Sequence, residues 1–139
     1  MKLSSFLAAA AAAISATAAA LPYEEANVAN GETYFKKLHL TGLPCWAPEI
    51  HVTNKFIPEL ELVVPYYAET TQGFQKKAIE RCRSSPDCEN IYIMSELWYA
   101  YFYKGPPTTK RDFDWRKARC DAGTRDTVAF SKRIKREFS

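Results

Sequence analysis

Cysteine is the residue type in this sequence with the most specific chemistry. The 139 residues contain four: Cys45, Cys82, Cys88 and Cys120. A structural zinc site uses four Cys or His ligands, generally in pairs with about two to four residues between them. Cys82 and Cys88 have five residues between them and form no Cys-x-x-Cys redox motif, and the other two cysteines stand alone. We therefore expect two disulfide bonds, with no metal site and no cofactor.

Four cysteines allow three pairings, and the sequence alone does not choose among them. A Cys82–Cys88 bond is geometrically easy, because Pro86 and Asp87 predict a turn between the end of a helix and the start of a strand. A Cys45–Cys120 bond would then close a loop of about 75 residues. The loop-entropy model gives such a bond about 4 kcal/mol of stabilisation.

Residues 1–20 have the pattern of a secretory signal peptide. Lys2 provides the positive charge, Phe6–Ala13 the apolar run, and small residues lead to a cleavage site after Ala20. No later run approaches the ~20 apolar residues that a membrane-spanning helix needs. We therefore expect a secreted, extracellular protein without a transmembrane segment, in a compartment where disulfides persist.

The rest of the chain is asymmetric in charge. Residues 21–103 carry seven Lys/Arg against eleven Asp/Glu, whereas residues 104–139 carry eleven against five. We expect a single disulfide-stapled domain over residues 21–121 and a basic C-terminal extension over residues 122–139, whose sparse apolar residues indicate a short helix or no fixed structure. The simplest interpretation is a solvated tail, and the alternative is that residues 104–139 attract an anionic surface such as phospholipid, polysaccharide or nucleic acid.

Hydrophobic periodicity predicts one main helix. Thr70 or Thr71 is a suitable N-cap, and Phe74, Ala78 and Cys82 then follow at steps of four on one helical face. Strand-like segments surround this helix: Ile50–Val52, Glu59–Val64, Ile91–Ile93 and Leu97–Tyr103. We therefore expect an α+β fold with a small antiparallel sheet, one main helix packed on it, and two disulfides.

The aromatic strand predicted over Leu97–Tyr103 suggests a binding surface. Alternation places Trp98, Ala100 and Phe102 on one face of the strand. If that face is the core, the tyrosines form an outer row suited to sugar stacking or to a protein hot spot, whereas the alternative is that both faces are covered. The candidate binding residues are Trp46, Trp98, Tyr99, Tyr101 and Tyr103.

Signals for an enzyme are sparse. His39 and His51 are the only histidines, and we expect His51 on the solvent-facing side of a strand. The chain has no Gly-x-Ser-x-Gly, no His-Glu-x-x-His and no phosphate-binding glycine loop. Glu59 and Glu61 are most simply explained by a solvated strand face. We therefore assign no catalytic residue.

Three stretches between Thr71 and Gly105 together resemble the PAN/apple family: "AIERCRSSPDC", "IYIM" and "WYAYFYKG". The chain has Leu97-Trp98 where the family commonly has a further cysteine. The resemblance implies a helix that packs across an antiparallel sheet, disulfides that tie the two together, and a secreted module that binds proteins or carbohydrates without catalysis. More broadly, the chain resembles small secreted cysteine-stapled proteins of filamentous fungi, many of which act on hosts or competitors.

We expect from these features a secreted, non-catalytic, effector-like module that engages a host or cell-surface protein or glycan. The alternatives are a small secreted hydrolase, ribonuclease-like or acting on cell walls, and a membrane-active protein that uses its basic tail. The sequence leaves the oligomeric state open.

Overall fold

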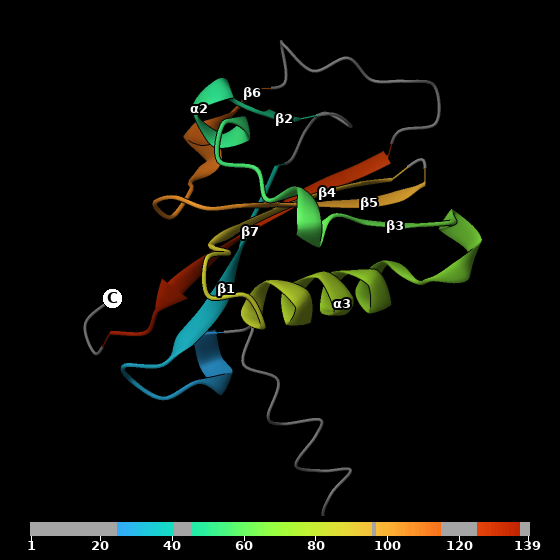
Figure 1. Ribbon diagram of the computed structural model, residues 1–139. Coiled ribbons are helices and arrows are strands. Elements are labelled where there is room, and N and C mark those ends of the chain that lie inside the picture. Colours follow the sequence, from blue (N-terminus) through green and yellow to red (C-terminus); the bar gives the residue numbers. More distant parts are fainter. Residues whose placement is uncertain (1–24, 41–45, 96, 115–124, 137–139) are drawn as a thin grey trace, which may run out of the picture. The chain divides into compact units, whose positions relative to one another are not determined.

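The computed structural model describes residues 25–40, 46–95, 97–114 and 125–136 (Figure 1). The chain divides into two compact units, one within residues 1–35 and 133–139 and the other within residues 36–132. In the first unit, which contains the 3₁₀ helix η1 (Glu25–Asn27), the N–H of Gly31 donates to the carbonyl of Lys135 (2.8 Å), and the N–H of Lys135 donates to the carbonyl of Glu32 (2.9 Å).

Five strands form the main sheet in the order β1-β7-β4-β5-β3. Their bounds are Thr33–Leu38 for β1, Leu62–Val64 for β3, Asn90–Ser95 for β4, Trp98–Tyr103 for β5 and Arg125–Ile134 for β7. The pairs β3–β5, β4–β5 and β4–β7 are antiparallel. A second, two-stranded sheet pairs β2 (Ala47–Pro48) with β6 (Phe113–Asp114). The predicted α+β fold with an antiparallel sheet is confirmed.

The main helix, α3, spans Thr71–Arg83 and begins as predicted. The Thr70 hydroxyl oxygen accepts a hydrogen bond from the N–H of Gly73 (3.0 Å), which satisfies one of the unpaired donors of the first turn. The four buried residues of the helix lie on one face: Phe74, Ala78, Ile79 and Cys82. The shorter helices are α2 (Ile50–Thr53) and the 3₁₀ helices η2 (Pro58–Leu60), η3 (Tyr66–Ala68) and η4 (Lys110–Asp112).

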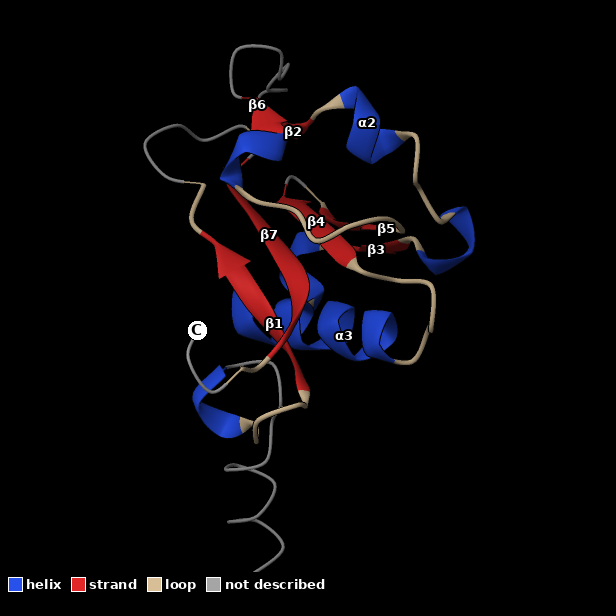
Figure 2. Cartoon of the chain, turned by 90° about the vertical axis from the view of Figure 1, so that its left-hand side faces the viewer, coloured by secondary structure: helices blue, strands red, loops and turns tan. Residues whose placement is uncertain are grey.

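Trp98 is the centre of the contact between α3 and the sheet. Its ring stacks between Tyr66 and Phe74, with centroid distances of 5.1 and 5.3 Å, and only 1% of the residue is exposed. Its indole N–H donates to the carbonyls of Tyr66 and Glu69 (3.2 and 3.3 Å). Ala100 and Phe102 share this face by alternation along β5 and are fully buried. Figures 1 and 2 show α3 along one side of β4 and β5.

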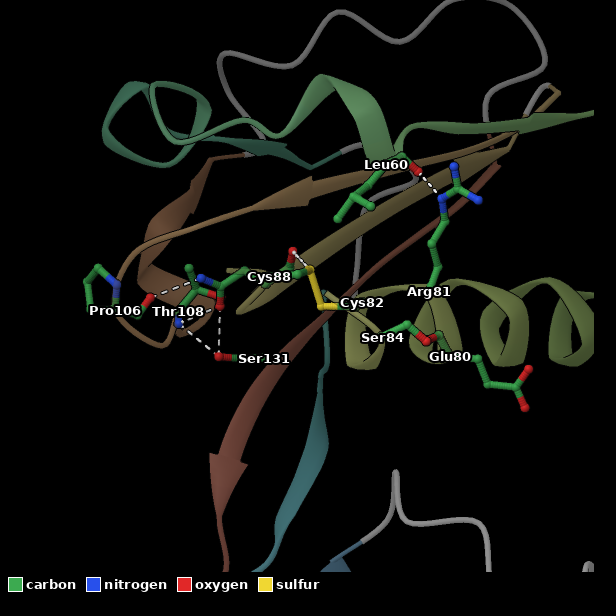
Figure 3. Close-up of a disulfide and its surroundings, with 10 residues drawn as sticks. Leu60, Glu80, Arg81, Cys82, Ser84, Cys88, Pro106, Thr108 and Ser131 are labelled. Carbon is green, nitrogen blue, oxygen red and sulfur yellow. Dashed lines mark hydrogen bonds between the residues drawn. A yellow bond between two sulfur atoms is a disulfide. The ribbon is translucent and has the colours of Figure 1, made fainter. Parts of the chain in front are cut away.

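A disulfide between Cys82 and Cys88 joins the last turn of α3 to the segment that enters β4 (Figure 3). The predicted pairing is therefore confirmed for these two residues. On the preceding residue, Arg81 Nε donates to the carbonyl of Leu60 (2.5 Å) and fixes the end of η2 to the helix. Cys45 and Cys120 lie outside the described residues.

A buried polar cluster around Asn90 fastens the loop after β5 to the sheet. Asn90 Oδ1 accepts hydrogen bonds from Thr108 N, Thr108 Oγ1 and Ser131 Oγ, at 2.9–3.0 Å. Asn90 Nδ2 donates to the carbonyl of Pro106 (2.9 Å). Asn90, Thr108 and Ser131 are each at most 4% exposed, and Figure 3 shows the cluster beside the disulfide. Hydrogen bonding inside the protein offsets the cost of burying these polar groups.

The expectation of a short helix or an unstructured tail over residues 122–139 is wrong for residues 125–134. These residues form β7, which lies between β1 and β4 in the sheet. Five consecutive residues, Thr127–Ser131, are buried. A strand that is covered on both faces lacks the alternation that identifies a half-exposed strand, and this run contains only two large apolar residues.

Two further predicted strands differ from the structure. Residues 50–53 form α2, because the N–H groups of Val52 and Thr53 donate to the carbonyl of Glu49 and close a helical turn. The strand predicted over Glu59–Val64 is shortened to β3, since Pro58 begins η2 and holds residues 58–60 in a 3₁₀ turn.

Removal of the disulfide will destabilise the domain. The bond closes a sequence separation of six residues, for which the loop-entropy model gives about 2 kcal/mol. We expect the double variant Cys82→Ala/Cys88→Ala to lose about that much unfolding free energy in urea titrations followed by circular dichroism. Asp87→Ala, an exposed change in the same loop, is the control and should stay within about 0.5 kcal/mol of the wild type. An unchanged urea midpoint for the double variant would contradict the assigned role.

Candidate functional site

The sheet face opposite α3 carries the predicted tyrosine row. In the antiparallel registers Tyr92 lies opposite Tyr101, and Tyr99 lies between Met94 on β4 and Val63 on β3. Directly opposed residues project from the same side of a sheet. The tyrosines of β4 and β5 therefore share one face with the exposed side of the edge strand β3.

One half of this face is covered. The Phe56 ring contacts Tyr101 and Tyr103, with centroid distances of 5.9 and 6.0 Å, and Phe113 stacks on Tyr92 at 6.0 Å. The Tyr92 hydroxyl donates to the carbonyl of Trp46. Burial, followed by neighbouring tyrosines, raises the pKa of both Tyr92 and Tyr103 far above the ordinary value. These two tyrosines belong to a second core, so this half offers no binding surface.

The other half of the face is open. The rings of Tyr99 and Tyr101 lie parallel, with an interplanar angle of 6° and a centroid distance of 5.9 Å. Both residues are partly exposed, as is Met94, and Val63 is 48% exposed. We call Glu61, Val63, Met94, Tyr99 and Tyr101 the tyrosine patch.

Glu61 gives the tyrosine patch a negative charge. The pKa of Tyr101 is raised by burial first, then by the Glu61 carboxylate and by Tyr99, so the carboxylate lies close enough to act on the phenol. Glu61 itself is exposed. Among the residues that the structure describes, no lysine, arginine or histidine forms an ion pair with Glu61. The described residues therefore leave the charge of this carboxylate unpaired.

The five predicted binding residues separate into two groups. Tyr99 and Tyr101 are accessible, whereas Trp46, Trp98 and Tyr103 are at most 8% exposed. The buried three serve the core: Trp98 packs against Tyr66 and Phe74, and Trp46 and Tyr103 belong to the second core. Lys110 Nζ also lies over the Trp46 ring, 5.3 Å from its centroid.

Sequence reasoning missed three members of the tyrosine patch. Met94 and Val63 reach it only through pairing with Tyr99, and cross-strand registers are not visible in the sequence. Glu61 was expected on a solvated strand face and is exposed. The alternation of Glu61 and Val63 was the available signal that both share one face.

His51 contacts a carboxylate, although the strand predicted around it is absent. His51 Nε2 lies 2.6 Å from Asp112 Oδ1, and the two side chains are 60% and 25% exposed. An ionised Asp only accepts, so the imidazole N–H donates. Asp112 Oδ2 accepts from the N–H of Thr109 (2.7 Å) and completes the capping box of η4. The pair thus links α2 to η4.

The environment of Asp112 favours its charged form. Burial on its own would raise the pKa of this carboxyl group, but hydrogen bonds from Thr109 and from His51 outweigh it and lower the pKa below the ordinary 3.8. Within the described part of the chain, no group of three or more His, Cys, Asp or Glu side chains is placed to hold a metal ion. None of the helices described is long and apolar enough to cross a membrane.

Comparisons with protein-family models, with curated proteins and with solved structures found no match for this chain.

The His51–Asp112 pair will make stability depend on pH. Because the folded pKa of Asp112 lies below the ordinary value of 3.8, its contribution is fully present above that value and is lost as the pH falls through the folded pKa. We expect Asp112→Asn to lower the unfolding free energy at pH 7 by on the order of 1 kcal/mol, and the difference to shrink at more acidic pH in urea titrations. Asp87→Asn, an exposed change of the same charge, is the control, and a pH-independent difference would contradict the assignment.

Proposed function

We propose that this chain is an exported, non-catalytic, effector-like binding module that engages a host or cell-surface protein or glycan through the tyrosine patch. The observation that carries the proposal is the open half of the sheet face, where two parallel tyrosine rings remain accessible beside Val63. Tyrosine is common at binding hot spots because its ring is rigid and apolar and its tip is polar.

The scaffold supports this proposal. The patch is built on β3, β4 and β5, and β5 is held to α3 by the buried Trp98 ring. A contact surface on packed strands changes shape little on binding, which lowers the entropic cost of association. The arrangement of a helix tied to a sheet by Cys82–Cys88 is also the one that the PAN/apple resemblance implies.

The hydrogen bond between His51 and Asp112 favours a second candidate function, cleavage of RNA. A carboxylate that orients an imidazole is a common element of general-base catalysis. In this reaction His51 would take the proton of a ribose 2′-hydroxyl, and the 2′-oxygen would form a bond to phosphorus as the bond from phosphorus to the 5′-oxygen breaks. The 5′-oxygen would take a proton from water, which leaves a 2′,3′-cyclic phosphate and a free 5′-hydroxyl. We rank this candidate second because His51 is 60% exposed, and general bases work best where water is largely excluded.

The first test of the binding proposal is the loss of cell-surface binding in Tyr99→Ala. Truncation removes a central ring of the patch, and hot-spot residues of this kind cost about tenfold or more in affinity. Fluorescently labelled protein should bind intact cells from a panel of plant, fungal and animal sources in flow cytometry, with saturation. Tyr67→Ala is the matched control, since Tyr67 is 91% exposed and lies outside the patch. Equal binding of both variants, or no binding of the wild type, would refute the proposal.

The second test separates binding from catalysis. The non-catalytic proposal predicts that total RNA incubated with the purified protein stays intact at pH 5 to 8, and that His51→Ala leaves cell-surface binding unchanged. Gel electrophoresis of the RNA provides the measurement, with Asn54→Ala as a control at an exposed position near α2. RNA cleavage that disappears in His51→Ala and persists in Asn54→Ala would establish the second candidate in place of the first.

A further inference from the structure

The tyrosine patch has the chemistry of a site for a cation. Aromatic faces carry negative electrostatic potential and attract ammonium and guanidinium groups. Tyr99 stacks on Tyr101 at 5.9 Å, and Tyr101 also stacks on Tyr92 at 6.4 Å, so the outer face of the Tyr99 ring is the aromatic surface left for a cation. The register that pairs Leu62 with Ala100 and Val63 with Tyr99 brings the Glu61 carboxylate beside Tyr101. A neutral ligand could stack on the exposed ring but would form no ion pair with Glu61.

The charges around Tyr101 also favour a cation as the ligand. Burial is the largest cause of the raised pKa of the Tyr101 phenol, and the Glu61 carboxylate and Tyr99 raise it further, so the surroundings disfavour a further negative charge at this position. Burial disfavours any charge, whereas the nearby Glu61 carboxylate disfavours an anion and attracts a cation. No described lysine or arginine forms an ion pair with Glu61, so the chain does not neutralise this charge through its own described residues.

Arginine fits the patch better than lysine. Its guanidinium is planar, stacks on aromatic rings and is weakly hydrated, and it can also form two parallel hydrogen bonds to a carboxylate. The aliphatic stem of an arginine needs apolar contacts, and Val63 and Met94 on either side of Tyr99 provide them. Ring, carboxylate and apolar neighbours thus match the three parts of one arginine side chain.

We infer that the tyrosine patch binds an arginine side chain from a basic segment of a partner protein, with the guanidinium on the outer face of the Tyr99 ring and its charge paired with Glu61. This inference rests on the proposed function, because it names the partner chemistry of the same surface. It commits the partner to a protein. A glycan is the competing occupant, and the experiment distinguishes it.

Fluorescence anisotropy with an octa-arginine peptide tests the inference. We expect saturable binding that weakens as salt is added, because screening reduces an exposed charge interaction. An octa-lysine peptide should bind about fivefold or more weakly, since its ammonium groups are compact and strongly hydrated and cannot stack on the rings. An octa-citrulline peptide, which keeps the planar group without the charge, should not bind.

Three variants locate the site. Glu61→Gln and Tyr99→Ala should each weaken octa-arginine binding about fivefold or more. Glu59→Gln removes the same charge two residues away, outside the patch, and should change binding less than twofold. All three residues lie on the surface or at its edge, and circular dichroism with thermal unfolding will verify that each variant folds. Equal losses in Glu59→Gln and Glu61→Gln would show unspecific charge attraction and overturn the inference.

The failure of this inference can be told from failure of the proposed function. If cell-surface binding requires Tyr99 but octa-arginine does not bind, the proposed binding function stands and the arginine assignment is wrong. If chitohexaose or laminarihexaose binds in a Tyr99-dependent manner while octa-arginine does not, the occupant is a glycan. If octa-arginine binding requires the patch but cell-surface binding does not require Tyr99, the proposed function is wrong.

Discussion

Burial of the central hairpin on both faces is the constraint on which the rest of this structure depends. Strands β4 and β5 are covered by α3 on one side and, except around Met94, Tyr99 and Tyr101, by a second core on the other, which includes Val52 and Phe113. A doubly covered strand must satisfy its polar groups inside the protein. The hydrogen bonds of Asn90, of the Trp98 indole and of the Tyr92 hydroxyl do so, and each one also fixes a loop or a connecting segment to the sheet.

The two faces of the hairpin are covered by different kinds of segment, and this difference creates the candidate site. One face is covered by the continuous helix α3, which the Cys82–Cys88 disulfide ties to the segment that enters β4. Short connecting segments cover the other, and Phe56 contacts Tyr101 and Tyr103 but leaves Tyr99 partly open. A surface that combines core-like residues with partial exposure is typical of a protein that completes its packing with a partner. The same residues that stabilise the hairpin therefore form the edge of the proposed contact.

The predictable part of the fold is the part governed by local rules. The four-residue spacing of Phe74, Ala78 and Cys82, with Thr70 before them, predicted α3 and its buried face, and alternation along β5 separated Trp98 from Tyr99. The unpredictable part depends on pairing between distant segments. Neither the position of β7 beside β4 nor the cover provided by Phe56 and Phe113 leaves a local pattern. The candidate site shows the same division, because alternation along β5 singles out Tyr99 and Tyr101 in the sequence, whereas the places of Val63 and Met94 depend on the strand register.

The place of β7 in the sheet has a consequence for how the chain folds. The hairpin β4–β5 and the helix before it are close in sequence and can form early, since short loops close at little entropic cost. Strand β1 has β7 as its neighbour, although Thr33–Leu38 and Arg125–Ile134 are separated by most of the chain. The sheet therefore remains incomplete until its most distant segments meet, and in that interval β4 exposes an unpaired edge to other chains. Folding speed and aggregation during folding will thus be governed by a strand that lies far in sequence from the helix and its disulfide.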